Sequence, residues 1–222
     1  MDYLSMTFKQ PAAKWYEALP LGNGSMGAMS YGRFQNEKIE LNLDTLWSGT
    51  GKRKENSNRE IDWEFLRNNI FDEKYLEAED YCRENVLGDW TESYLPAGNL
   101  KIDVKVPVLT EAGSYKRQLS FKEAIENVEF CQEGKRYQRE FFVSMSEPVM
   151  ALHYHSGKDC SLEMELSLES QIHHQTSLFE KNGLLMEGQA PVSVAPPYYS
   201  CKNPIVYQEG LGIRFAFCLY VQ

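Results

Sequence analysis

Apolar and polar residues alternate along much of the second half of the chain. Every second position is apolar in three runs, 102–108, 162–168 and 213–221. A period of two places one set of side chains on a core face and the other set on the opposite face of a strand. These runs predict strands with one buried face, and several such strands favour antiparallel sheets packed face to face. We therefore expect a mainly β protein, an antiparallel β-sandwich of the super-sandwich type.

A hairpin is predicted in the middle of the chain. Residues 128–130 and 137–143 are rich in apolar and aromatic residues, and Glu133-Gly134 between them is a turn signal. A further strand is expected to begin at Met150.

Residues 57–88 interrupt the β pattern. Their apolar residues recur at helical spacing: Ile61, Phe65, Leu66, Tyr75, Ala78, Cys82 and Val86. We expect a short two-helix insertion near residues 58–88. Asp72 is predicted as the N-cap of the second helix, and Gly88 as the residue that follows its last turn.

Composition excludes several classes of partner. The chain has 222 residues, 42% of them hydrophobic and 25% charged, which is enough apolar material for one large domain. A net charge of -9 argues against a nucleic-acid partner, because Lys52-Arg53-Lys54 is the only compact basic run. No run approaches the roughly 20 apolar residues of a membrane span, and residues 1–10 lack the features of a signal peptide. We expect no membrane partner and a cytoplasmic location.

Neither a metal nor another cofactor is predicted. The five cysteines are scattered and never spaced as CxxC, which argues against a disulfide framework and a zinc site. His153 and His155 share a strand face and His173-His174 follows later, but the spacing supplies no third ligand. We interpret these histidines as surface or hydrogen-bonded side chains.

Residues 15–32 are dense in glycine. Gly22, Gly24 and Gly27 form a literal GxGxxG, which in a dinucleotide-binding unit lies between a strand and a helix. Here Pro20 precedes the glycines, and the residues after them alternate like a strand. We therefore expect a tight turn, which glycine permits, rather than a nucleotide site.

The same segment, Trp15 to Tyr31, together with Ile39 to Gly49, resembles the opening signature of family 95 glycoside hydrolases. That signature consists of a Trp, then ALPLGNG, GAM and LN-x-DTLWSG. Later segments resemble the family in the same order, so that the resemblance covers nearly the whole chain: 66–67, 75–79, 93–100, 137–144, 188–191 and 212–215. Ser25 replaces a usual Arg, Leu43 replaces a usual Glu, and Ala97-Gly98-Asn99 replaces Leu-Gly-Asp.

The resemblance implies an α-L-fucosidase-like exo-glycosidase in which a β-sandwich precedes a catalytic (α/α)6 barrel. It implies that residues 1–222 are the amino-terminal domain, that the barrel is absent, and that this chain holds no catalytic residues. The sequence also stops inside an alternating run, at Tyr220-Val221-Gln222, so we expect the domain to be truncated at its C-terminal end. The parent enzyme would hydrolyse α-L-fucosyl linkages of a fucosylated oligosaccharide with inversion. The domain would support the barrel of the same polypeptide and be inactive alone. Two alternatives stay open: a free-standing carbohydrate-binding module, and the same domain from an α-L-galactosidase.

Glycoside hydrolysis uses two carboxyl groups about 5–10 Å apart, so carboxylate pairs in this chain are candidate catalytic groups. Glu163 and Glu165 would lie roughly 6–7 Å apart on one strand face. Any amphipathic strand offers that spacing, so we interpret them as a solvated outer face.

Four residues of the signature remain candidates for substrate binding or for an interface with the barrel: Asn23, Asn42, Asp44 and Trp47. Aromatic rings stack on sugar faces, and amides and carboxylates bond to hydroxyl groups. The alternative that we favour is that Trp47, like Trp15, packs against other parts of the protein.

Overall fold

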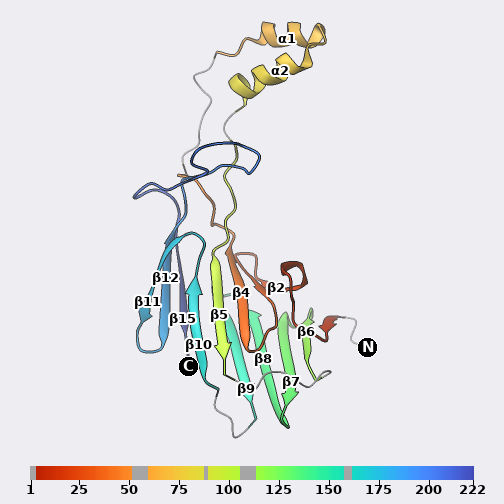
Figure 1. Ribbon diagram of the computed structural model, residues 1–222, viewed down its shortest axis with the longest axis vertical. Coiled ribbons are helices and arrows are strands. Elements are labelled where there is room, and N and C mark those ends of the chain that lie inside the picture. Colours follow the sequence, from red (N-terminus) through yellow and green to blue (C-terminus); the bar gives the residue numbers. More distant parts are fainter. Residues whose placement is uncertain (1–3, 52–59, 88–89, 106–113, 158–161) are drawn as a thin grey trace. The chain divides into compact units, whose positions relative to one another are not determined.

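The computed structural model describes residues 4–51, 60–87, 90–105, 114–157 and 162–222 (Figure 1). They form two compact units. The sandwich unit consists of Met1–Trp47, Tyr94–Ala190 and Ile213–Gln222, and the helical unit consists of Ser48–Ser93 and Pro191–Gly212.

Two five-stranded antiparallel sheets make up most of the sandwich unit (Figure 1). The first has the order β1-β6-β7-β8-β9, with β1 Ser5–Phe8, β6 Lys116–Ser120, β7 Ile125–Gln132, β8 Lys135–Val143 and β9 Met150–Ser156. The second has the order β10-β5-β4-β3-β2, with β10 Met164–Glu169, β5 Gly98–Val104, β4 Asn36–Leu43, β3 Met26–Ser30 and β2 Leu19–Gly22. A short 3-10 helix, η1 (Trp15–Glu17), precedes β2. The predicted antiparallel β-sandwich is confirmed.

A third, three-stranded sheet has the order β11-β12-β15, with β11 His173–Phe179, β12 Gly183–Gln189 and β15 Arg214–Tyr220. Met186 of β12 is fully buried, and its methyl group lies where a side chain at Gly98 of β5 would stand. The predicted strands at 150, 162–168 and 213–221 are confirmed within about two residues. In the run 102–108, the positions of Val106 and Val108 lie outside the described residues.

The predicted hairpin is β7-β8, joined by Glu133 and Gly134 at φ 52° and 73°. Two consecutive positive φ values are the signature of a type I′ turn, whose twist matches the twist of the strands that it joins.

Alternating residues of both five-stranded sheets build the core. The inward faces contribute Ile39 and Leu41 of β4, Leu100 and Ile102 of β5, Val128 and Phe130 of β7, and Phe141 of β8, all at most 6% exposed. This burial is the expected consequence of the period-two pattern.

The same interior contains charged groups. Arg139 of β8 forms ion pairs with Glu37 of β4 and, at 2.8 Å, with Glu126 of β7. Ser30 of β3 bonds to both Arg139 and Glu126. Buried charges require such partners, because an unpaired one would lose its hydration without compensation.

The helical unit holds α1 (Trp63–Phe71), α2 (Tyr75–Tyr81), a π-helical turn (Cys82–Val86), and the strand pair β13 (Ser193–Val194) and β14 (Ile205–Val206). The two predicted helices are confirmed, but the predicted cap is wrong. Asp72 is the C-cap of α1, and Lys74 precedes α2 without a side-chain cap. The capping carboxylate is that of Asp62, which accepts a bond from the Phe65 amide at the start of α1. Gly88, which was predicted to follow the last turn of the second helix, lies outside the described residues.

Candidate functional site

Asn23 shapes the turn between β2 and β3. Its side-chain oxygen accepts bonds from the amides of Ser25 and Met26, at 3.0 and 2.8 Å, and its amide group donates to the Ser144 carbonyl at 2.7 Å. Gly24 lies in this turn at φ 95°. The glycine-rich segment is therefore a β-hairpin turn as predicted, and the side chain of Asn23 is occupied by backbone groups.

Asp44 and Trp47 follow β4. The indole nitrogen of Trp47 donates to the Asp44 carbonyl at 2.8 Å, and the Trp47 ring lies 5.2 Å from the Tyr94 ring. Trp47 is 42% exposed, so it is neither a core residue nor a free surface ring. The Asp44 side chain is exposed.

Asn42 belongs to a hollow on the outer face of the second sheet. Outward-facing positions are in register across three strands: Met29 pairs with Glu40, and Glu40 pairs with Asn99. Asn42 lies two residues beyond Glu40 on the same face. The hollow has a volume of about 290 Å³, and its aromatic side chains come from Trp15 and Tyr94.

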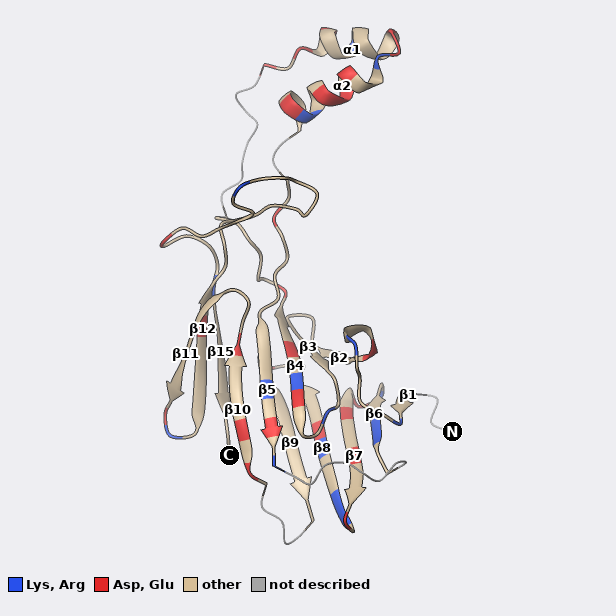
Figure 2. Cartoon of the chain, in the orientation of Figure 1, with Lys and Arg blue, Asp and Glu red and all other residues tan. Residues whose placement is uncertain are grey.

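The charges at the floor of this hollow are compensated. One oxygen of Glu40, Oε1, accepts bonds from the Lys38 ammonium and the Tyr31 hydroxyl, both at 2.8 Å. Partial burial opposes ionisation, but these two bonds hold the pKa of Glu40 below its ordinary value. Burial and the bond to Glu40 raise the pKa of Tyr31 to about 12. Glu40 is therefore an oriented carboxylate and Tyr31 a neutral hydroxyl donor at neutral pH. Figure 2 shows the interspersed acidic and basic residues along β4 and β5.

The structure brings together only part of the predicted set. Asn42 lines the hollow, and Trp47 touches Tyr94 at its edge. Asn23 and Asp44 do not line it. Sequence reasoning missed Glu40 and Asn99, whose signal was their position on the polar side of two alternating runs.

A second cavity in the sandwich unit is larger and apolar. It has a volume of about 640 Å³ and is lined mainly by inward-facing aliphatic and aromatic side chains, among them Leu41, Leu100, Phe141, Leu152 and Phe217. These residues come from both five-stranded sheets and from β15. Few polar groups reach the cavity, so it suits an apolar segment rather than a hydrophilic ligand.

The remaining candidates form no site. Glu163 pairs with Lys105 and is 72% exposed, which fits a solvated face. His153 lies 3.4 Å from Glu140, on the exposed side of β9. Among the described residues, no group of three His, Cys, Asp or Glu side chains could hold a metal ion. In the same part of the chain, no helix is long and apolar enough to cross a membrane.

Ser48 and Gly49, the last two residues of the DTLWSG segment, make contacts within the helical unit. Ser48 donates to Glu92 at 2.7 Å and accepts a bond from the Ser93 amide at 2.9 Å. A side chain at Gly49, which has φ 112°, would stand 2.6 Å from the Glu92 carboxyl group. Ser48 and Gly49 therefore have a structural role within the helical unit.

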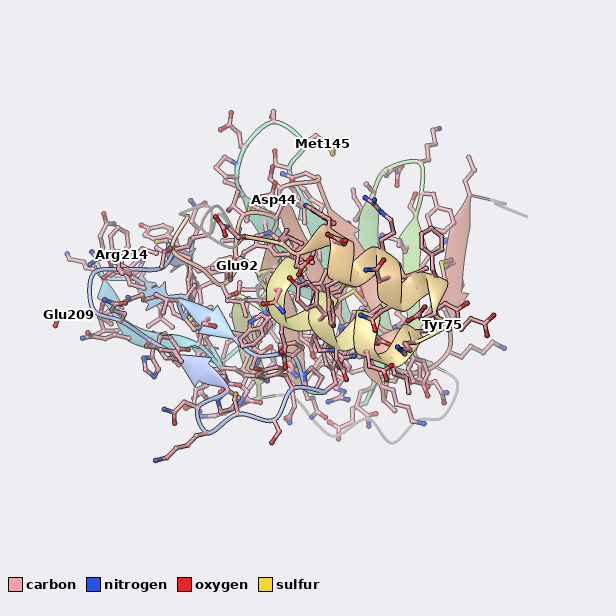
Figure 3. All side chains as sticks on the ribbon, turned by 90° about the horizontal axis from the view of Figure 1, so that it is seen from above. Asp44, Tyr75, Glu92, Met145, Glu209 and Arg214 are labelled. Carbon is pink, nitrogen blue, oxygen red and sulfur yellow. The ribbon has the colours of Figure 1, made fainter. Side chains whose placement is uncertain are left out.

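Large apolar side chains are exposed on both helices. Phe71 of α1 and Leu76 of α2 are 77% and 74% exposed, and Tyr75, labelled in Figure 3, is 63% exposed. Trp63 and Ile70 add to this surface at 59% and 51%. So much apolar surface on a short helix pair is typical of a protein-protein contact.

Comparison with known proteins identifies the family. The family described as "Glycosyl hydrolase family 65, N-terminal domain" matches residues 6–221. Alpha-L-fucosidase 2 of Arabidopsis thaliana is 29% identical over 227 residues, 99% of this chain and 26% of the plant protein. Probable alpha-fucosidase A of Aspergillus niger is 28% identical over 165 residues, 70% of this chain and 20% of the fungal protein. The chain thus spans about a quarter or less of the length of these relatives, and the matches support its resemblance to the amino-terminal domain of family 95 enzymes. The chain belongs to the family of glycosyl hydrolase family 65 N-terminal domains.

Proposed function

We propose that this chain is the non-catalytic amino-terminal domain of an α-L-fucosidase-like exo-glycosidase. In this proposal the whole enzyme hydrolyses α-L-fucosyl linkages with inversion, and a helical catalytic barrel lies elsewhere in the same polypeptide. The observation that carries the proposal is that family similarity extends over residues 6–221 while the chain spans 26% of a relative named as an α-L-fucosidase.

Two features of the structure support a role in binding the rest of the enzyme. Apolar side chains of α1 and α2 are exposed to solvent, and the 640 Å³ cavity is lined by apolar groups of the sandwich unit. Burial of these apolar groups against further polypeptide would be favourable by roughly 25 cal/mol per Å² of apolar surface.

The proposal is tested by comparing the 222-residue chain with the whole gene product on aryl α-L-fucosides. We expect turnover by the longer protein and none above background by the chain. NMR of the sugar released by the longer protein should show β-L-fucose first, because inversion converts the α linkage into the β anomer. Turnover by the chain itself that is lost in Glu163→Gln would contradict the proposal. Preferential turnover of aryl α-L-galactosides by the longer protein would mean that the enzyme is an α-L-galactosidase instead.

A free-standing carbohydrate-binding module is the second candidate function. The hollow with Trp15, Tyr94 and Asn42 favours it, since aromatic and amide groups are the usual contacts of a sugar. A gene that ends at Gln222, together with sugar binding by the chain, would support this alternative.

A further inference from the structure

The hollow on the outer face of the second sheet combines groups that no structural role in the chain explains. The Asn42 side chain has no hydrogen-bond partner among the residues that the structure describes. Trp15 is 57% exposed although it borders the hollow. Both side chains are therefore available to a ligand.

Glu40 is prepared to accept hydrogen bonds. Lys38 and Tyr31 both bond to its Oε1 atom, which fixes the carboxylate and leaves Oε2 for another donor. A carboxylate held by its neighbours accepts bonds from a ligand hydroxyl without a further loss of side-chain entropy. The side-chain amide of Asn99, next to Glu40 in the register, makes a long 3.5 Å contact with Glu169.

Charge and size restrict the ligand. Lys38 and Glu40 are the charged residues that line the hollow, and they pair with each other, so the floor offers no net charge to an ionic ligand. The volume of 290 Å³ is at the lower end of the range of small-molecule sites, about 300–1,000 Å³. Aromatic rings beside carboxylate and amide groups match a ring that has an apolar face and several hydroxyl groups.

We propose that this hollow is a binding site for one neutral pyranose ring, with Trp15 and Tyr94 against the ring and Asn42 and Glu40 on its hydroxyl groups. The choice of L-fucose as the ring rests on the proposed function. The site would hold a second sugar of the substrate or a released monosaccharide.

Saturation-transfer NMR of the 222-residue chain with L-fucose and methyl α-L-fucopyranoside tests the site. The method also reads binding to self-associated protein, so association of the chain does not invalidate it. We expect transfer to the sugar, and an affinity about tenfold lower in Trp15→Ala and in Asn42→Ala. Asp103→Ala, on the same outer face but outside the hollow, is the matched control and should bind as the parent does.

Each outcome decides between the proposals. No transfer from any pyranose, or equal transfer to the acyclic control sorbitol, would overturn the site and would leave the hollow as a contact surface for another part of the enzyme. Binding that survives both substitutions would also overturn it. Transfer to D-glucose but not to L-fucose would support a pyranose site and would show that L-fucose, chosen from the proposed function, is not its ligand. Hydrolysis of aryl α-L-fucosides by the longer protein tests that function separately.

Discussion

Arg139 on β8 and Glu37 on β4 form an ion pair whose two side chains are both 0% exposed between the five-stranded sheets. Glu126 accepts a second bond from the same guanidinium, so one buried cation faces two carboxylates. The amide of Tyr31 also donates to Glu37, at 3.0 Å. This network connects the two sheets through specific directions, which apolar contacts alone do not provide.

The substitution Arg139→Met should destabilise the domain strongly. It removes the cation and leaves Glu37 and Glu126 buried without a positively charged partner, for which losses of about 3–5 kcal/mol are typical. Urea unfolding followed by tryptophan fluorescence measures the change. Arg136→Met, in the same strand but with its side chain 61% exposed, is the control and should leave the midpoint unchanged. Equal effects of the two substitutions would contradict a special role of the buried network.

The stability of the domain should depend on the ionisation of Glu37. Burial raises the pKa of Glu37 above its ordinary value of 4.5, in spite of the opposing effect of Arg139. Because its pKa is higher in the folded state than in the unfolded chain, Glu37 makes its full contribution to stability at pH values below 4.5. This contribution is lost as the pH rises through the pKa of the folded state. The free energy of unfolding of the parent relative to Glu37→Gln should therefore fall with rising pH above 4.5. A difference that does not vary with pH would show that Glu37 has the same pKa in the folded and unfolded chains.

Trp47→Ala should cost about 1–2 kcal/mol, less than the truncation of a core tryptophan. The half-exposed ring loses one contact with Tyr94 and one hydrogen bond to the Asp44 carbonyl. A double-mutant cycle with Tyr94→Ala should give a coupling energy of about 0.5–1.5 kcal/mol. Zero coupling would mean that the two rings are adjacent without stabilising each other.

The β7-β8 turn offers a stabilising substitution. Glu133 has φ 52°, a region that Asn adopts more readily than Glu, and Asn-Gly is the preferred type I′ pair. Glu133→Asn should raise the free energy of unfolding by about 0.5–1 kcal/mol, as turn optimisation commonly does. Gly134→Ala should lower it by about 1 kcal/mol through backbone strain alone, because a side chain there would meet nothing within 4 Å. Thermal unfolding measures both, and a destabilised Glu133→Asn would reject the assigned turn.

The 222-residue chain should self-associate in solution. Within the described strands, one edge of β15 is unpaired, and its aromatic and aliphatic residues favour pairing with another chain. Tyr220→Lys, at a position 50% exposed, should reduce the association seen by light scattering, because an edge lysine opposes strand pairing. Phe142→Lys on β8, a central strand with neighbours on both sides and with this side chain 42% exposed, is the control. An equal reduction by both would indicate general surface hydrophobicity rather than the β15 edge.

The strands β1, β6, β11 and β12 were not predicted from the sequence. The sequence alone was sufficient for β7 to β10 and β15, the hairpin at Glu133-Gly134, the glycine turn and the presence of two helices. These features depend on residues close in the chain: period-two alternation fixes which side chains share a face, and positive φ values select glycine. The cap of α2 was mispredicted because Asp72 can end one helix as well as begin the next, and only the backbone path decided between them.

Tertiary structure alone decided the hollow and the buried network. Arg139 and Glu37 are 102 residues apart, and Glu40 meets Asn99 only through the register of β4 and β5. A charged residue in an alternating run gives no local sign of whether its face is buried or exposed, since that depends on which sheet packs against it. The sequence therefore determined the faces of the strands, and long-range pairing determined which polar groups met on each face.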